Sequence, residues 1–143
     1  MFSKATDEWA TPDAFFDALH AEFGFTLDAA ASEENHKTPD YLTIEDDALT
    51  YSWTLNRAVW LNPPYSKCRA FIAKAAEEAR KGVTVVCLVP SRTDTRWWHD
   101  YVWNVATNSP RPGVQVRFIK GRLKFGGAAQ GAPFPSVVVV FSP

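Results

Sequence analysis

The segment Asn62-Pro63-Pro64-Tyr65 combines the residue types best suited to chemistry in this sequence. Its asparagine has an amide oxygen that accepts hydrogen bonds, its prolines stiffen the backbone and expose a carbonyl outside any strand ladder, and its tyrosine supplies a flat ring. Directly before it, residues 58–61 form an apolar run typical of a buried strand. We therefore expect a loop at a strand end that binds a planar amine such as the N6 of adenine, although Asn-Pro-Pro also occurs in ordinary turns.

Two other predicted strands also end in polar residues. Asp28 lies near the end of a strand predicted at 25–31, and Ser91-Arg92 follows an apolar run at 83–89. Ligands of open α/β sheets collect at the carboxyl ends of the strands, near the point where the strand order reverses. We therefore expect Asp28, Asn62 and Ser91-Arg92 to open onto one cleft. The alternative for Asp28 is a helix cap or a solvated turn residue.

The elements that would position these residues alternate between helix and strand. A first helix is expected to have Thr11 as its N-cap and Pro12 at its first position, and to end at Gly24. A clear helical period predicts the next helix, at 67–81. The predicted strands are 25–31, 41–44, 57–61, 83–89, 114–119 with a continuation through a bulge at Gly121 to Phe125, and 136–141.

A third helix and a loop are expected in the second half of the chain. The helix follows Asp94 and has a shared face made by Trp97, Trp98, Tyr101, Val102 and Val105. Residues 126–135 contain three glycines and two prolines, which predicts a loop that is mobile without ligand.

This order of elements predicts an α/β fold in three layers with a doubly wound, Rossmann-like sheet. The apolar run at 83–89 should be a central parallel strand that is covered on both faces. The last two strands have no helix between them, so they should pair antiparallel. The expected sheet is therefore mostly parallel with an antiparallel last strand.

Length and composition favour a single soluble domain. The 143 residues are 46% hydrophobic and 22% charged, and no apolar run approaches the ~18 residues of a membrane span. The N-terminal residues do not resemble a signal peptide, which predicts a cytoplasmic protein without membrane contact. Cys68 and Cys87 have neither paired spacing nor a neighbouring histidine, so we expect small core residues and no metal site.

The net charge of −1 conceals two halves of opposite sign. Residues 1–66 have 3 bases and 12 acids, which gives −9, and residues 67–143 have 12 bases and 4 acids, which gives +8. A basic surface built from the second half could bind phosphates. Alternatively, the two halves neutralise each other across the fold.

Seven short motifs occur in order along the chain. They are Trp9-Ala10-Thr11-Pro12, Leu27-Asp28-Ala29-Ala30-Ala31-Ser32, Asp46-Asp47-Ala48-Leu49, Asn62-Pro63-Pro64-Tyr65-Ser66, Pro90-Ser91-Arg92-Thr93-Asp94-Thr95-Arg96-Trp97, Gly121-Arg122-Leu123-Lys124-Phe125 and Pro133-Phe134-Pro135-Ser136. Together they resemble the phage-type DNA N6-adenine methyltransferases of the Dam class. The resemblance implies S-adenosylmethionine as cofactor, DNA as partner, and the methyltransferase variant of the doubly wound sheet. Residues 1–143 would form one domain without a separate target-recognition domain.

The resemblance also implies a role for individual residues. The catalytic residues would be Asn62, Pro63, Pro64 and Tyr65. The side-chain oxygen of Asn62 and the carbonyl of Pro63 would accept the two hydrogens of the adenine N6 amine, while Tyr65 would stack on a base extruded from the duplex. The cofactor would contact Trp9, Thr11, Pro12, Asp28, Ala29, Ala30, Asp47 and Asn62.

Within this cofactor set, Asp28 would meet the ammonium group of the methionine moiety. Asp47 would approach the ribose or adenine, and adjacent Asp46 is its rival for that place. The turn at 29–31 consists of alanines where many relatives have glycines, and alanine disfavours positive φ. How closely the backbone there approaches the cofactor is therefore an open question.

The substrate would contact Tyr65, Ser66, Arg92, Arg122 and Lys124. The arginines would bind phosphates or a guanine edge, or else belong to a solvated face. No metal is expected, and the oligomeric state, monomer or homodimer, is open. Two other functions are also open: methylation of another planar nitrogen, such as an RNA base or a protein glutamine, and a non-catalytic relative that binds nucleic acid.

Overall fold

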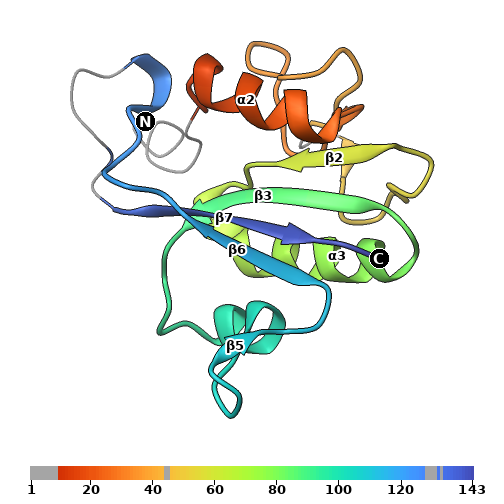
Figure 1. The fold of residues 1–143 in the computed structure, drawn as a ribbon. Helices are drawn as coiled ribbons and strands as arrows, with labels where there is room; N and C mark the ends of the chain where they lie inside the picture. The colour runs from red at the N-terminus through yellow and green to blue at the C-terminus, as the bar shows by residue number, and fades with distance from the viewer. Residues whose placement is uncertain (1–9, 44–45, 128–131, 133) are drawn as a thin grey trace.

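A five-stranded mixed sheet lies at the centre of the computed structural model, which describes residues 10–43, 46–127, 132 and 134–143 (Figure 1). The strand order is β1-β2-β3-β7-β6, with bounds Leu27–Asp28, Ala58–Leu61, Thr84–Pro90, Ser136–Phe141 and Val114–Phe118. β1, β2 and β3 are parallel, whereas β7 is antiparallel to both β3 and β6. The predicted central strand and the antiparallel pairing of the last two strands are confirmed.

The four residues of β2 alternate between two apolar cores. Val59 and Leu61 pack in the core that contains α3 (Cys68–Arg80), whereas Ala58 and Trp60 pack in the core that contains α2 (Asp13–Phe23). All four side chains are at most 2% exposed. Because side chains alternate along a strand, the next position, Asn62, falls on the α2 side of the sheet.

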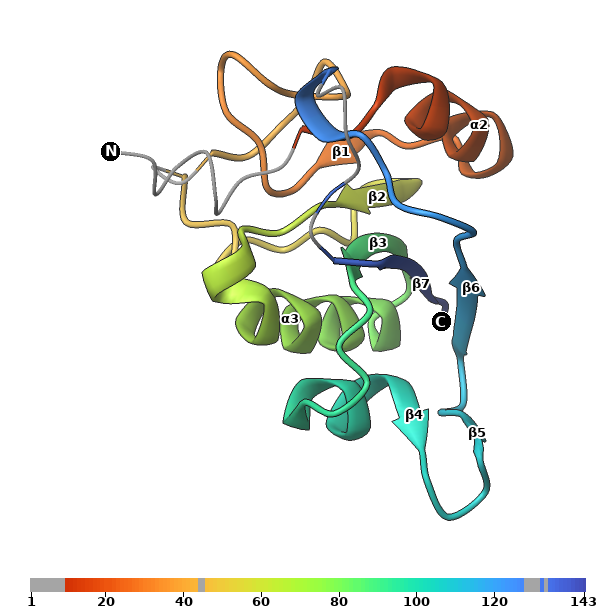
Figure 2. The same ribbon diagram turned by 90° about the vertical axis from the view of Figure 1, so that its left-hand side faces the viewer.

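α2 and α3 cover opposite faces of the sheet (Figure 2). α2 contributes Phe16 and Leu19 to its core, and α3 contributes Phe71 and Ile72 to the other. The described chain is therefore a mixed α/β protein in three layers, and its sheet is parallel in part.

The predicted start of α2 is wrong by one residue, and its predicted end is confirmed. The residue before the helix is Pro12, with φ −57° and ψ 135°, so the chain becomes helical only at Asp13. Thr11 is not the N-cap of the helix, and its hydroxyl instead accepts a hydrogen bond from Asn62. At the other end, Gly24 has φ 68°, and this left-handed conformation lets its N–H reach the carbonyl of His20.

Two strands before β2 are shorter than predicted. The strand predicted at 25–31 is limited to β1, although the N–H groups of Thr26 and Ala29 still donate to carbonyls of β2. The strand predicted at 41–44 is reduced to one parallel bridge between Tyr41 and Asp28, and Ile44 lies outside the described residues. The edge of the sheet next to Asp28 is therefore made by irregular chain.

The predicted continuation of the late strand through Gly121 to Phe125 is wrong. β6 ends at Phe118, which pairs with Val137 next to the first residue of β7. Among the described residues between Phe118 and β7, none pairs with a strand. Gly121 has φ 76° outside any strand, and the chain then forms a short 3-10 turn, η4 (Phe125–Gly127).

The third predicted helix is short. It is a π-helix, η3 (Trp98–Val102), and the chain becomes extended at Trp103, where β4 (Trp103–Asn104) pairs with β5 (Ser109–Pro110). Trp98 and Val102 are buried as expected, but Val105 is 67% exposed. The placement of Val105 on the buried face is wrong because the helix ends before it.

The helix predicted at 67–81 is confirmed as α3, which follows a 3-10 turn, η2 (Tyr65–Lys67). Cys68 and Cys87 are free and buried, as predicted, and burial raises the pKa of the Cys68 thiol to about 12. Residues 128–131 and 133 of the predicted mobile loop lie outside the described residues.

Candidate active site

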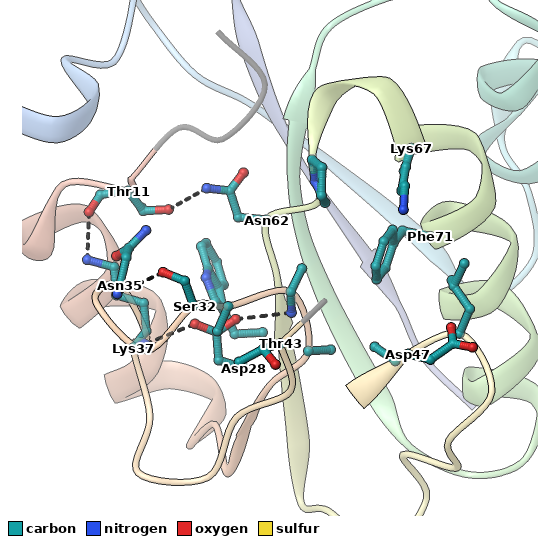
Figure 3. Close-up of a pocket in the computed structure, with 17 residues that line it drawn as sticks. Thr11, Asp28, Ser32, Asn35, Lys37, Thr43, Asp47, Asn62, Lys67 and Phe71 are labelled. Carbon is teal, nitrogen blue, oxygen red and sulfur yellow. Dashed lines mark hydrogen bonds between the residues drawn. The ribbon is translucent and has the colours of Figure 1, made fainter. Parts of the chain in front are cut away.

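A pocket opens beside the carboxyl ends of β1 and β2 (Figure 3). Asp28, the last residue of β1, and Asn62, the first residue after β2, both line it. The space measures about 820 Å³, part of which is open to solvent. The carboxyl ends of β1 and β2 therefore share one cleft.

The pocket brings together most, but not all, of the predicted cofactor and catalytic residues. The predicted residues that line it are Thr11, Asp28, Ala29, Ala30, Asp47, Asn62 and Pro64. Pro12, Pro63 and Tyr65 do not line it, and Trp9 lies outside the described residues. Ten further residues line it that were not among the predicted site residues, although four of them belong to the quoted motifs: Ala31, Ser32, Ala48 and Leu49 from the motifs, and Asn35, Lys37, Thr43, Trp60, Lys67 and Phe71.

Asp28 is a buried carboxylate at one end of the pocket. It is 4% exposed, its Oδ2 accepts the N–H of Lys37 at 2.9 Å, and its Oδ1 accepts the N–H of Ala30 at 3.3 Å. Burial raises the pKa of Asp28 to about 6, although these two N–H groups and the charges of His36 and Lys37 lower it. A cation in the pocket would favour the ionised carboxylate that burial disfavours, so Asp28 suits a positively charged ligand.

The alanine turn after Asp28 is built without glycine. The N–H of Ala29 donates to the carbonyl of Trp60 at 3.0 Å, and the N–H of Ala31 donates to that of Leu42 at 2.9 Å. None of residues 29–31 has a positive φ. The turn therefore avoids the left-handed conformation that glycine favours.

Asn62 is oriented by Thr11. Its Nδ2 donates to the Thr11 Oγ1 at 3.0 Å, and Figure 3 shows the Asn62 amide oxygen pointing away from Thr11. Thr11 is only 4% exposed, so water competes little with the Asn62 amide for its hydroxyl. This contact distinguishes the two ends of the amide and fixes which way the acceptor faces.

Asp47 and Asp46 differ clearly in their surroundings. The Asp46 Oδ2 accepts the N–H of Thr43 at 2.8 Å and its hydroxyl at 3.1 Å, which closes a local turn. Asp47 instead lines the pocket, and its φ of 52° is a left-handed conformation that aspartate tolerates better than most residues. Between the two rivals, the geometry favours Asp47 as the pocket carboxylate.

The pocket wall at residues 47–49 is anchored to α3. The indole Nε1 of Trp53 donates to the carbonyl of Ala48 at 3.2 Å, and the Trp53 N–H donates to the Glu78 carboxylate. Glu78 is fully buried and forms an ion pair with Lys74 at 3.1 Å. Because a buried carboxylate needs its partners, this cluster ties the wall firmly to the helix.

Tyr65 contacts residues outside the pocket. Its ring stacks on Phe134 with centroids 5.1 Å apart, and its hydroxyl accepts a hydrogen bond from the Arg92 Nη2 at 2.6 Å. Neither Ser91 nor Arg92 lines the pocket. The expectation of one cleft is thus met by Asp28 and Asn62, while Arg92 reaches the Asn-Pro-Pro-Tyr loop through Tyr65.

The other predicted substrate residues lie at the surface. Arg122 is exposed and its Nη1 donates to the carbonyl of Ala132 at 3.4 Å, and Lys124 and Ser66 are exposed too. Their contacts with DNA remain predictions. Lys37, by contrast, lines the pocket but was not expected there, because the polar stretch at 32–40 has neither a helical nor a strand period that would reveal which side chains point inward.

Within the described ranges, no group of three or more His, Cys, Asp or Glu side chains is arranged to hold a metal ion. No helix in the same part of the chain is both long enough and apolar enough to cross a membrane.

The structure is that of a mixed α/β protein with a pocket at the ends of parallel strands. The sequence profile of the family described as DNA N-6-adenine-methyltransferase (Dam) matches residues 2–143. The chain therefore belongs to the phage-type family of DNA N6-adenine methyltransferases.

Two phage proteins illustrate the similarity. The DNA N-6-adenine-methyltransferase of Escherichia phage T1 is 37% identical over 101 residues, which cover 70% of this chain and 42% of the phage protein. The DNA N-6-adenine-methyltransferase of Haemophilus phage HP1 is 31% identical over 140 residues, which cover 96% of this chain and 79% of that protein. The match thus spans less than half the length of the first relative and most of the second.

Proposed function

We propose that this chain transfers a methyl group from S-adenosylmethionine to the N6 amine of adenine in DNA. The observation that carries the proposal is that Asp28 and Asn62 line one pocket in a chain of this family. Asp28 suits a cationic ligand and Asn62 suits a planar amine. We further propose that the sheet is the Rossmann-like methyltransferase variant and that residues 1–143 act as a single domain.

The lining of the pocket fits the proposed cofactor chemically. The buried Asp28 suits the ammonium group of the methionine moiety, and Asp47 suits the ribose hydroxyls or the adenine amine. Leu49 and Phe71 supply apolar surface for a flat ring. When bound, S-adenosylmethionine supplies an electrophilic methyl group on a sulfonium sulfur and leaves as the neutral thioether.

Asn62 and Pro63 prepare the amine for reaction. The Asn62 side-chain oxygen and the Pro63 carbonyl accept the two hydrogens of the adenine N6 amine. These hydrogen bonds draw the hydrogens aside and reduce the conjugation of the nitrogen lone pair with the ring, so that the lone pair becomes nucleophilic. Thr11 supports this role because its hydroxyl holds the nitrogen end of the Asn62 amide. Positioning and oriented dipoles therefore supply the catalysis.

Tyr65 holds the target base. The N6 amine of a base inside a duplex is out of reach of a pocket, so the base is extruded and its ring stacks on Tyr65. The tyrosine ring already stacks on Phe134, which indicates that this surface accepts a flat aromatic partner. Arg92 and Arg122, both exposed, bind the phosphates on either side of the base.

The test is transfer of labelled methyl groups by the purified chain to DNA, followed by digestion and identification of N6-methyladenine. The matched substrate is the same DNA with 2-aminopurine in place of adenine, because 2-aminopurine lacks an amine at C6. We expect label in the first DNA and none in the second. Label in both would contradict N6 as the acceptor.

Two other acceptors and one binding measurement complete the test. RNA and glutamine-containing peptides should receive no label, and transfer to either instead of DNA would favour another planar nitrogen as the substrate. Calorimetric titration with S-adenosylmethionine should show binding. A chain that binds DNA but not S-adenosylmethionine would be a non-catalytic relative.

A further inference from the structure

Lys37 joins three segments around the pocket. Its N–H donates to the Asp28 Oδ2 at 2.9 Å, and its Nζ donates to the Thr11 carbonyl at 2.7 Å and to the Asp13 Oδ1 at 2.8 Å. The Lys37 side chain is only 13% exposed, whereas that of Asp13 is 88% exposed. The contact with Thr11 is therefore shielded from water, and the ion pair with Asp13 is not.

These contacts continue to the Asn-Pro-Pro-Tyr loop. Lys37 holds the main chain of Thr11, and the Thr11 hydroxyl accepts the Nδ2 of Asn62 at 3.0 Å. Figure 3 shows this succession of hydrogen bonds from Asp28 through Lys37 and Thr11 to Asn62. We call the succession the Lys37 bridge.

We propose that Lys37 is a positioning residue for methyl transfer, which orients Asn62 by holding Thr11. The inference rests on the proposed function and adds a residue that neither the sequence motifs nor the predicted site includes. The position requires a hydrogen-bond donor at the end of a long side chain, because the Lys37 Nζ donates to the Thr11 carbonyl while the Lys37 N–H is held by Asp28. The loop at 32–40 thereby determines how Asn62 faces the substrate.

Lys37 also lies between the part of the pocket proposed for the cofactor and the part proposed for the substrate amine. Asp28 belongs to the part of the pocket that suits the cofactor ammonium group, and Asn62 is the residue that meets the substrate amine. Lys37 therefore contacts both ends of the pocket, through its N–H at Asp28 and through its Nζ at Thr11.

The direct test is nitrogen-15 NMR of the Asn62 side-chain amide in the protein without cofactor or DNA. The signal is assigned by its absence in Asn62→Ala. Lys37→Met, which keeps the apolar stem but loses the donor, should move this signal toward that of a free asparagine. Asp13→Asn, the matched control for the exposed ion pair, should leave it unchanged. An unchanged Asn62 signal in Lys37→Met would overturn the proposal.

Kinetics provide the second measurement. Lys37→Met should lower kcat about tenfold, while the Kd for S-adenosylhomocysteine changes by less than about threefold. Lys37→Arg, which keeps a donor, should recover part of kcat. Equal losses in kcat and in binding, without recovery by arginine, would indicate general damage to the pocket and would contradict a positioning role.

A double-mutant cycle separates this role from a purely structural one. Thr11→Val removes the acceptor for Asn62, so adding it to Lys37→Met should reduce kcat further by much less than it does alone. Independent, multiplying effects would contradict the Lys37 bridge. Should Lys37→Met not fold, Lys37→Leu, which also lacks a donor, carries the same expectations. A wild-type chain that does not methylate adenine contradicts the proposed function, whereas a fully active Lys37→Met contradicts only this inference.

Discussion

The hydroxyl oxygen of Thr11 lies 3.0 Å from the side-chain nitrogen of Asn62, a residue 51 positions further along the chain. This hydrogen bond connects the segment before α2 with the loop after β2. It explains why a threonine stands before Pro12 although it caps no helix. The same contact makes the orientation of the Asn62 amide a property of the folded chain rather than of the loop alone.

Replacement of Asn62 should separate catalysis from binding. Asn62→Ala removes the acceptor for the substrate amine at the edge of the pocket, so the fold and the affinity for S-adenosylhomocysteine should change little, while methyl transfer falls by at least about 100-fold. Labelled methyl transfer, calorimetry and a thermal melt measure the three quantities. A variant as active as the wild type would sink the proposed mechanism.

Cofactor binding should depend on pH through Asp28. Its pKa is raised by burial from 3.8 to about 6, so the folded protein binds a proton that the unfolded chain has already lost in this interval. The contribution of Asp28 to stability is therefore full below pH 3.8 and is lost as the pH rises through about 6. A ligand ammonium group prefers the ionised carboxylate, so affinity should change in the opposite direction.

We thus expect the Kd for S-adenosylhomocysteine to fall as the pH rises through about 6, approaching tenfold per unit on the acid side, and then to level off. Calorimetric titrations across this range measure it. Asp28→Asn should bind weakly at every pH, with a flat profile. A wild-type profile as flat as that of the variant would show that Asp28 does not meet the ammonium group.

Replacements of Asp47 can separate the effect of its charge on cofactor binding from the effect of its backbone conformation on stability. Asp47→Asn removes the charge but keeps a residue that tolerates a φ of 52°, so binding of S-adenosylhomocysteine should weaken about tenfold with little change in Tm. Asp47→Ala should lose binding and also Tm, because alanine disfavours this conformation. Asp46→Asn, in contrast, should affect the local turn at Thr43 more than cofactor binding.

Arg122 should contribute to the salt dependence of DNA binding. If it neutralises one phosphate, Arg122→Ala should reduce the slope of log Kd against log salt by about one. Arg117→Ala is the matched control, because Arg117 is engaged by Glu22 at 2.6 Å. An equal slope in wild type and Arg122→Ala would place Arg122 on a solvated face.

The sequence was sufficient where a local pattern decides the structure. The valines of β7, the Gly24 helix end and the apolar run before Asn62 are local signals, and each of these elements formed as expected. Because Asp28 and Asn62 both lie at the ends of predicted parallel strands, the sequence was also enough to predict that they share one cleft.

The predictions failed where the structure of a segment depends on a partner that is distant in the sequence. The predicted strand segment at 121–125 did not form because β6 ends at Phe118, where its partner β7 is one residue from its own start, and the helix after Asp94 ends where Trp103 pairs with Pro110. Lys37 could not be assigned because its partner Thr11 lies 26 residues away in a segment with no shared pattern. The choice between Asp46 and Asp47 likewise depended on which carboxylate Thr43 engages.

The stacking of Tyr65 on Phe134 has a consequence for the kind of adenine that this protein would accept. A ring supplied by the same chain competes with any incoming ring at a fixed and high effective concentration. Free adenine or a lone nucleoside must win this competition by stacking alone. An adenine within a DNA strand that is bound to the protein would also have a raised effective concentration. The contact between Tyr65 and Phe134 would therefore favour adenine within DNA over free adenine or a lone nucleoside as the substrate.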